Sequence, residues 1–220
     1  MFERLLDLFF PRYSLSGSEG QWITEDERKR MKLYPIRFDK QLLRKKEIKN
    51  LDCLIAAGSY QASPLLRKAI KTFKYGRIAD LGPDLAKKIV DCLPGLLLLP
   101  EKYRNASSIA ICPVPLHWTR AFQRGFNQAE ILAQHIGKQR KWHIQNFLKR
   151  SKATGHQAWR NREERLIALS NAFICICDTP PPCVLLIDDI SSTGATLDAC
   201  AKALKNSGAK HVVGLVVAYG

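Results

Sequence analysis

From about Asp52 onward, short apolar runs alternate with longer segments whose apolar residues recur three and four positions apart. Short apolar runs between polar stretches are typical of buried strands, and the three-and-four spacing predicts amphipathic helices. The predicted strands are Cys53–Ala57, Ser108–Val114, His143–Leu148, Ala172–Cys177, Val184–Ile187 and Val212–Ala218. The predicted helices are Ser63–Tyr75, Leu81–Leu93, Asn127–Gln139 and Ala195–Lys205.

This alternation indicates an α/β protein, with a mostly parallel sheet flanked by helices on both faces. In the last predicted helix, Leu197, Cys200, Ala201 and Leu204 fall on one face, and Gly208 follows where a helix-ending glycine belongs. Ligands of such sheets bind beyond the carboxyl ends of the strands. We therefore look for the chemistry at that edge.

The first fifty residues have a different character from the rest. Ser14–Gly20 is polar and rich in turn formers, Glu25–Lys32 is densely charged, and Arg44–Lys49 is basic. We therefore predict an N-terminal appendage over residues 1–50 and a main domain over residues 51–220.

The composition is that of a globular protein, and no apolar run approaches the ~20 residues that a membrane helix needs. Met1–Phe10 is apolar, but Glu3 and Asp7 interrupt it and no small-residue cleavage site follows. We expect a cytoplasmic protein without a membrane span. The seven cysteines include no CxxC pair, which predicts buried reduced thiols rather than a disulfide framework.

The net charge of +15 is the outlier of the composition. It predicts an anionic partner, which can be a nucleic acid, a phosphorylated metabolite or a membrane surface. Charge alone does not choose among these, and many basic proteins have solvated basic surfaces.

The segment Val184–Thr196 carries the clearest chemical signal. Four apolar residues end at Asp188 and Asp189, and a loop of small hydroxyl residues then leads through Gly194 into a helix. Amide groups at a helix N-terminus can cradle a phosphate, and a glycine lets the backbone approach it closely. The two carboxylates are placed to accept hydrogen bonds from vicinal ribose hydroxyls. The predicted phosphate-binding residues are Ser191, Ser192, Thr193, Gly194, Ala195 and Thr196.

Parts of this pattern are common, because an acidic pair after a strand also occurs in phosphorylatable receiver domains and other magnesium sites. The contiguous string is much more specific than its parts. It predicts a ligand that carries both a phosphate and a ribose, with phosphoribosyl pyrophosphate (PRPP) as the first candidate.

Three stretches of the chain resemble the ComF family of phosphoribosyltransferase-like competence proteins. The central one is Pro113–His117 with Arg120 and the string Arg124–Ala129, and the PRPP loop is the second. The third surrounds residues 150–173. A further stretch upstream, which is expected to be helical, also resembles the family. Its matching residues are Tyr60, Leu66, Ile70, Phe73, Lys74, Tyr75, Leu85 and Ala86. The third stretch is matched at Arg150, Thr154, Gln157, Arg165, Ala172 and Phe173.

The resemblance implies a type I phosphoribosyltransferase-like fold and a role in natural transformation. It makes the loop Pro115, Leu116 and His117 a pyrophosphate-binding loop, whereas without it a turn set by two prolines is the simpler interpretation. Mg²⁺ would accompany PRPP. If the chain is a transferase, Asp188 and Asp189 would hold the ribose, and three cations would neutralise the leaving pyrophosphate: Arg120, Arg150 and Lys152.

The N-terminus departs from the family pattern, in which a zinc ribbon of two CxxC pairs is common. Tyr13 and Ser16 stand in place of the first pair, and Tyr34 and Arg37 in place of the second. Zinc needs thiolate or imidazole ligands in this arrangement. We therefore predict a degenerate zinc ribbon without bound zinc.

Residues 120–165 contain far more Lys and Arg than Asp and Glu, with aromatic residues between them. Basic grooves with aromatic platforms bind single-stranded nucleic acid. The candidates are Arg120, Arg124, Lys149, Arg150, Trp159 and Arg160. The alternative is that Phe122, Phe126 and Trp142 belong to the core and that the charges form a solvated face. Ser151–Trp159 is interpreted as a mobile lid.

Three functions remain open. The chain can be a DNA-handling protein that acts on incoming single-stranded DNA beside the DNA-uptake machinery. It can be an active phosphoribosyltransferase with a nucleobase-like acceptor, and these two are compatible because a strand's 5′-phosphate and ribose resemble part of PRPP. It can also be a PRPP-responsive regulator without turnover.

Overall fold

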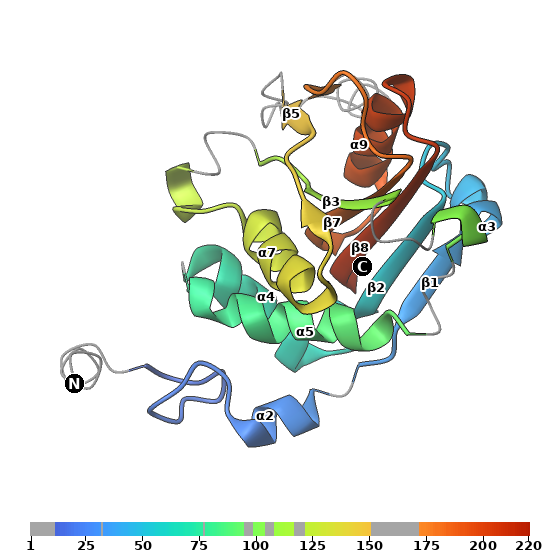
Figure 1. Ribbon diagram of the computed structural model, residues 1–220. Helices are drawn as coiled ribbons and strands as arrows, with labels where there is room; N and C mark the ends of the chain where they lie inside the picture. The colour runs from blue at the N-terminus through green and yellow to red at the C-terminus, as the bar shows by residue number, and fades with distance from the viewer. Residues whose placement is uncertain are drawn as a thin grey trace, which may run out of the picture.

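A computed structural model describes residues 12–31, 33–76, 78–94, 99–103, 108–116, 122–150 and 172–220. Within these residues the main sheet has six strands in the order β1-β2-β8-β7-β3-β4 (Figure 1). All neighbouring strands are parallel except β1 and β2, which pair antiparallel. The strands are β1 (Ile36–Asp39), β2 (Cys53–Ser59), β3 (Ile109–Pro113), β4 (His143–Ile144), β7 (Cys183–Ser191) and β8 (His211–Tyr219).

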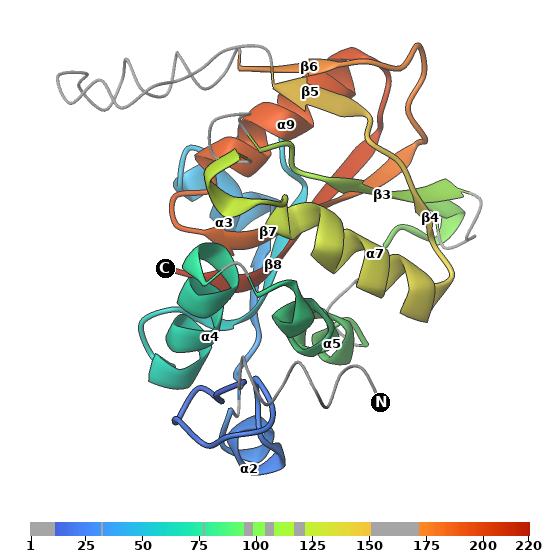
Figure 2. The same cartoon turned by 90° about the vertical axis from the view of Figure 1, so that its left-hand side faces the viewer.

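Helices cover both faces of this sheet, as the alternating pattern predicted (Figures 1 and 2). One face carries α4 (Pro64–Tyr75), α5 (Gly82–Cys92) and α7 (Gln128–Arg140). The other face carries α3 (Lys40–Lys45) and α9 (Ala195–Asn206). Two short 3₁₀ helices, Ala79–Leu81 and Glu101–Tyr103, lie in the connections on either side of α5. The predicted class, an α/β protein with a mostly parallel sheet between helices, is confirmed.

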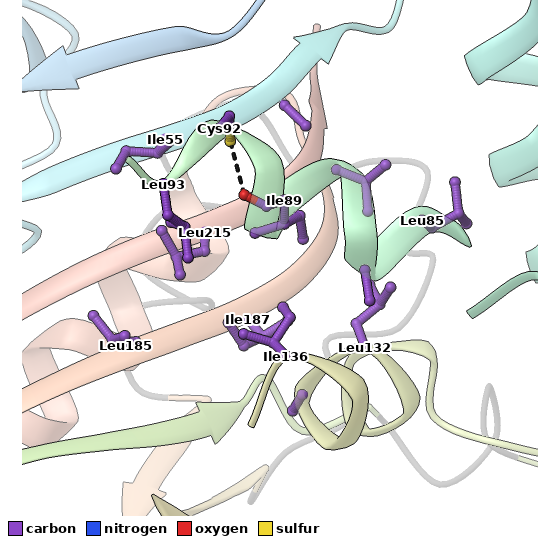
Figure 3. Close-up of a cluster of buried hydrophobic side chains, with 14 of the residues drawn as sticks. Ile55, Leu85, Ile89, Cys92, Leu93, Leu132, Ile136, Leu185, Ile187 and Leu215 are labelled. Carbon is purple, nitrogen blue, oxygen red and sulfur yellow. Dashed lines mark hydrogen bonds between the residues drawn. The ribbon is translucent and has the colours of Figure 1, made fainter. Parts of the chain in front are cut away.

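The larger core lies between the sheet and α5 and α7 (Figure 3). Alternate strand residues such as Ile55, Leu185 and Leu215 meet Ile89 of α5 and Ile136 of α7, and all five are fully buried. Burying each such side chain contributes about 1.5–3 kcal/mol relative to leaving it exposed. The period of two along the strands thus supplies one apolar row to each face of the sheet.

A second, two-stranded antiparallel sheet pairs β5 (Leu148–Arg150) with β6 (Phe173–Cys175) and packs on α9. The sequence predicted one strand over His143–Leu148, which was wrong in its extent. The segment makes a two-residue strand beside β3 and then leaves the main sheet to form the hairpin. The predicted lid, Ser151–Trp159, lies outside the described residues.

The N-terminal part also contributes to the main sheet. We predicted no strand before Asp52, yet β1 pairs with β2, and Leu43 of α3 is fully buried in the second core. The division of the chain at residue 50 stays a prediction. The sequence Ile-Arg-Phe-Asp of β1 does alternate apolar and polar residues, but four half-buried residues are too short a run to distinguish a strand from a loop.

Glu27 organises the segment where the zinc ribbon would lie. Its side chain is completely buried in α2 (Glu25–Arg30) and accepts hydrogen bonds from the backbone and hydroxyl of Ser16 and from the backbone of Thr24. Thr24 Oγ1 in turn accepts from the Glu27 amide at 3.1 Å, which completes a capping box. Burial raises the pKa of Glu27, but these hydrogen bonds outweigh it and hold the pKa below its usual value.

A second buried carboxylate, Asp52, fixes the amino edge of the sheet where β2 and β8 begin. Its oxygens lie 2.7 Å from Lys205 Nζ and 3.0 Å from Lys40 Nζ, and Oδ2 accepts from the Val212 amide at 3.0 Å. Burial raises the pKa of Asp52, but the hydrogen bonds from Lys205, Val212 and Lys40 outweigh it and leave the pKa lowered.

We expect Asp52→Asn to lower the free energy of unfolding at pH 7 by about 2–4 kcal/mol, because Lys205 and Lys40 lose a buried anionic partner. A lowered pKa stabilises the fold above the unfolded-state pKa and is lost as the pH falls through the folded-state pKa. Urea unfolding should therefore show a smaller difference in unfolding free energy between the variant and wild type as the pH falls below the ordinary pKa of 3.8. A deficit that is equal at pH 7 and pH 3 would contradict this ion-pair account.

Candidate functional site

The acidic pair lies inside a strand rather than just after one. The sequence predicted a strand over Val184–Ile187, whereas β7 continues to Ser191, with Asp188 opposite Val216 and Ser191 opposite Tyr219 of β8. Since strand side chains alternate, Asp189 falls on the face covered by α4 and α7, and Asp188 falls on the face covered by α9. The two carboxylates therefore point to opposite sides of the carboxyl edge.

Asp189 is held by a lysine that comes from α4. Its Oδ1 lies 3.0 Å from Lys74 Nζ, and the two side chains are only 6% and 14% exposed. The second oxygen, Oδ2, is buried and has no hydrogen-bond partner among the described residues, and the same is true of Ser191 Oγ and Gln128 Nε2. Buried polar atoms without partners are uncommon, so this edge of the sheet has hydrogen-bonding capacity for a ligand.

Asp188 is protonated more easily than an ordinary aspartate. Burial and the neighbouring charge of Asp189 raise its pKa from 3.8 to about 7, against the opposing effects of the Asp189 amide, Lys74 and Arg124. The Asp189 amide donates to Asp188 Oδ1 at 2.8 Å. At neutral pH the pair therefore carries less than two negative charges, which favours hydroxyl groups as its partners over a directly bound cation.

The loop after β7 turns sharply into α9. Gly194 is the N-cap residue, with a φ of 81°, and a Cβ there would lie 2.3 Å from Ile48 Cδ1. Within the first turn of α9, Asp198 accepts hydrogen bonds from the backbone amides of Asn50 and Leu51 at 2.6 and 3.2 Å. The first-turn carboxylate is thus engaged by neighbouring amides. The amides of the first turn remain oriented towards the loop of Ser192, Thr193 and Gly194.

The central signature lies next to the acidic pair. The Val114 amide donates to the Ile187 carbonyl at 2.9 Å, which places Pro115 and Leu116 at the carboxyl edge beside β7. Asn127, the N-cap residue of α7, donates from Nδ2 to the Val114 carbonyl at 3.1 Å. The predicted residues His117 and Arg120 lie outside the described residues.

Arg124 joins this group through two contacts. Its Nη1 donates to Gln128 Oε1 at 3.0 Å, and its guanidinium lies 5.7 Å from the centre of the Tyr75 ring. Its charge also reaches Asp188, whose pKa it lowers. The structure therefore brings together α4, the signature segment and β7 around the two carboxylates.

The remaining predicted cations lie elsewhere or outside the described part. Lys149 and Arg150 are on β5, where the Arg150 guanidinium lies 5.4 Å from the centre of the Phe173 ring. Lys152, Trp159 and Arg160 lie outside the described residues. Of the three aromatics assigned to the core as an alternative, Phe126 packs against Phe73 and Trp142 packs at the core margin, whereas Phe122 is 85% exposed. The core assignment was therefore wrong for Phe122.

Sequence reasoning did not assign Lys74 or Gln128 to the site. Both lie in stretches that resemble the ComF family, but neither follows a strand or belongs to a phosphate-loop pattern. Lys74 is one of four cations on α4 and looks like part of its solvated face. Only the packing of α4 against β7 shows that its side chain is directed to Asp189.

A separate cavity of about 260 Å³ lies between α2 and α5. It is lined by charged side chains such as Arg28 and Asp84 and contains none of the residues around Asp188. In the described part of the chain, no three His, Cys, Asp or Glu side chains form a group that could hold a metal ion. None of the helices in the described ranges is long and apolar enough to cross a membrane.

Fold and site together define an α/β protein with an adjacent acidic pair and a glycine-bearing loop at the carboxyl edge of a mostly parallel sheet. No family model matches the chain. Competence protein F of Haemophilus influenzae is 29% identical over 92% of this chain and 82% of its own length. Competence protein ComFC of Streptococcus pneumoniae is 32% identical over 70% of this chain and 65% of its own length. DNA utilization protein YhgH of Escherichia coli is 27% identical over 72% of this chain and 68% of its own length. The chain belongs to the ComF family.

We expect Asp188→Asn to have a free energy of unfolding roughly 1–2 kcal/mol higher than wild type at pH 8, because it removes a charge that burial disfavours. Its urea unfolding midpoint should rise accordingly. A raised pKa means that the folded protein keeps a proton that the unfolded chain has lost, so stability falls as the pH rises from about 4 to about 7. The two proteins should converge near pH 4. Asp91→Asn, on the exposed side of α5, is the control and should show no such pH dependence.

We expect Gly194→Ala to lower the free energy of unfolding by about 2–3 kcal/mol. The alanine would have to adopt the left-handed backbone conformation, and its Cβ would displace the buried Ile48. Gly208 also has a positive φ, 112°, but a Cβ there would lie in open space. Gly208→Ala should therefore lower the free energy of unfolding by only about 1–2 kcal/mol. Ile48→Val in the Gly194→Ala background deletes the clashing atom. Urea unfolding should then show partial recovery, and no recovery would refute the clash.

Proposed function

We propose that this ComF-family protein binds PRPP through a type I phosphoribosyltransferase-like fold and acts on single-stranded DNA during DNA uptake. The observation that carries the proposal is the continuous strand, loop and helix from Asp188 to α9, in which the half-buried Asp188 and the buried Asp189 precede a helix N-terminus. A ligand that fits both parts has a diol next to a phosphate. The ribose 5-phosphate half of PRPP has that chemistry.

In this proposal the carboxylates bind the sugar and the loop binds its phosphate. The carboxylates leave the strand on opposite faces, so each would accept from a different ribose hydroxyl: Asp189 through its unpartnered Oδ2, and Asp188 from the side of α9. Amides and hydroxyls of residues 191–196 would bind the 5′-phosphate, as helix N-termini do. Gly194 supports this role because it allows the left-handed turn into α9 at a position where a Cβ would meet the buried Ile48.

Magnesium would enter the site with the pyrophosphate of PRPP. The described residues fit this arrangement, because the two carboxylates share less than two charges and the adjacent Lys74 already offsets part of that charge. The loop at Pro115 and Leu116 would face the pyrophosphate from the end of β3. Mg²⁺ bound there would neutralise phosphate charge, and the proposal involves no zinc.

The role in DNA uptake rests on the relatives. Two of them are named as competence proteins and a third as a DNA utilization protein. A net charge of +15 suits a polyanionic partner. The 5′ end of a DNA strand shares with PRPP a pentose that carries a 5′-phosphate, although its deoxyribose lacks the 2′-hydroxyl. The phosphate loop could therefore bind a strand end as well as the small ligand, with fewer hydroxyl contacts to the carboxylates.

A transferase reaction is the second candidate, and the pKa of Asp188 favours it. A carboxyl group with a pKa of about 7 can exchange a proton with an acceptor near neutral pH, as a general base must. Displacement of pyrophosphate from the ribose would then follow. Release of pyrophosphate in the presence of a defined base would separate this function from PRPP binding alone.

We expect calorimetric titration of PRPP with Mg²⁺ into the full chain to give a Kd on the order of micromolar. The double variant Asp188→Asn/Asp189→Asn should lose this binding, because each amide offers one acceptor oxygen in place of the two of a carboxyl group and removes the negative charge. Asp91→Asn, which removes an exposed carboxylate from α5, should bind like wild type. Absence of binding by folded wild-type protein would overturn the proposal.

A further inference from the structure

The outer face of α4 combines positive charge with an exposed aromatic ring. Leu66, Ala69, Ile70 and Phe73 of this helix are buried against the sheet. Lys68, Lys71 and Tyr75, three and four positions apart, share the exposed face. We call these three residues the α4 face. The helix contains no Asp or Glu, so no intrahelical ion pair neutralises it.

Tyr75 is more than a stray surface residue. Its side chain is 73% exposed although it is large and partly apolar, and the Arg124 guanidinium lies 5.7 Å from the ring centre. This cation–π contact, together with the hydrogen bond from Arg124 to Gln128, holds the ring in place at the end of α4. A second ring, Phe122, is 85% exposed in the same short turn as Arg124.

The α4 face ends beside the candidate site. Lys74, between Lys71 and Tyr75, turns inward to the ion pair with Asp189, while its two lysine neighbours on the face remain directed to solvent. A ligand that runs along the α4 face therefore arrives at the carboxyl edge of the sheet. The 3.0 Å contact between Lys74 Nζ and Asp189 Oδ1 links this end of α4 to β7.

A solvated basic face accounts for the lysines but not for the aromatic rings. One exposed ring, Tyr75, is held against Arg124, and a second, Phe122, lies two residues before that arginine in the sequence. Exposed apolar surface that gathers among charges can mark an interaction site. A partner that satisfies all these groups carries regularly spaced negative charges and flat apolar surfaces. Single-stranded nucleic acid has both, since its phosphates pair with Lys and Arg and its bases stack on aromatic rings.

We propose that single-stranded DNA runs along the α4 face, with its phosphates on Lys68 and Lys71 and a base stacked on Tyr75, towards the acidic pair. This inference rests on the proposed function, because it uses the same site as the end of the DNA path. It assigns DNA contacts to α4, whereas the sequence pointed only to residues after Arg120. Phe122 supplies a second stacking surface beside Arg124.

The test is fluorescence anisotropy of a 3′-labelled 20-nucleotide oligothymidine titrated with the full chain at several salt concentrations. Tyr75→Leu keeps an apolar side chain but removes the ring face, and should weaken binding roughly tenfold. Lys68→Gln/Lys71→Gln should lower the slope of log K against log salt by about 1.4, or about 0.7 for each lost phosphate contact. Lys138→Gln/Lys210→Gln removes two exposed charges at the amino edge of the sheet and should leave the slope nearly unchanged.

Each variant is also titrated with PRPP, and its urea midpoint confirms that it is folded. Weaker DNA binding with wild-type PRPP binding in Tyr75→Leu supports the α4 path. DNA binding that the α4 variants change no more than the control overturns the path, although PRPP binding by the same proteins would keep the proposed function. Binding to phosphatidylserine vesicles without binding to the oligonucleotide also overturns it, because the face would then be a membrane surface.

Discussion

Two adjacent carboxylates on a buried strand are the constraint around which the rest of this protein is arranged. Asp188 and Asp189 repel each other and lose hydration in the interior, which is costly unless nearby cations compensate. The compensation comes from Lys74 on α4 and from Arg124 before α7, two segments far apart in the sequence. The packing of both helices against β7 is therefore tied to the charge balance at the carboxyl edge.

The two edges of the sheet treat their carboxylates differently. At the amino edge, Asp52 is met by two lysines and a backbone amide, and its lowered pKa shows that the anion is well satisfied. At the carboxyl edge, compensation is incomplete, because the pKa of Asp188 is raised and Asp189 Oδ2 has no partner in the described residues. The first arrangement stabilises the fold, whereas the second leaves hydrogen-bonding capacity unused at a cost in stability.

A single buried carboxylate organises the N-terminal segment. Ser16 and Thr24 donate hydrogen bonds to the Glu27 carboxylate, which connects the turn before α2 to the helix itself. Hydrogen bonds to one central anion can hold a short segment together much as bonds to one central cation do. The segment β1 then continues into the main sheet beside β2.

Sequence alone determined the class of fold and the strand-to-helix loop at Asp188–Thr196, because hydrophobic period and short motifs are local properties. It did not determine that β7 runs through both carboxylates, since polar residues end an apolar run whether or not neighbouring strands continue. Nor did it distinguish Lys74, which faces Asp189, from Lys71, which faces solvent. The role of a charged side chain depends on which distant segment lies opposite it, and only the tertiary structure decides that.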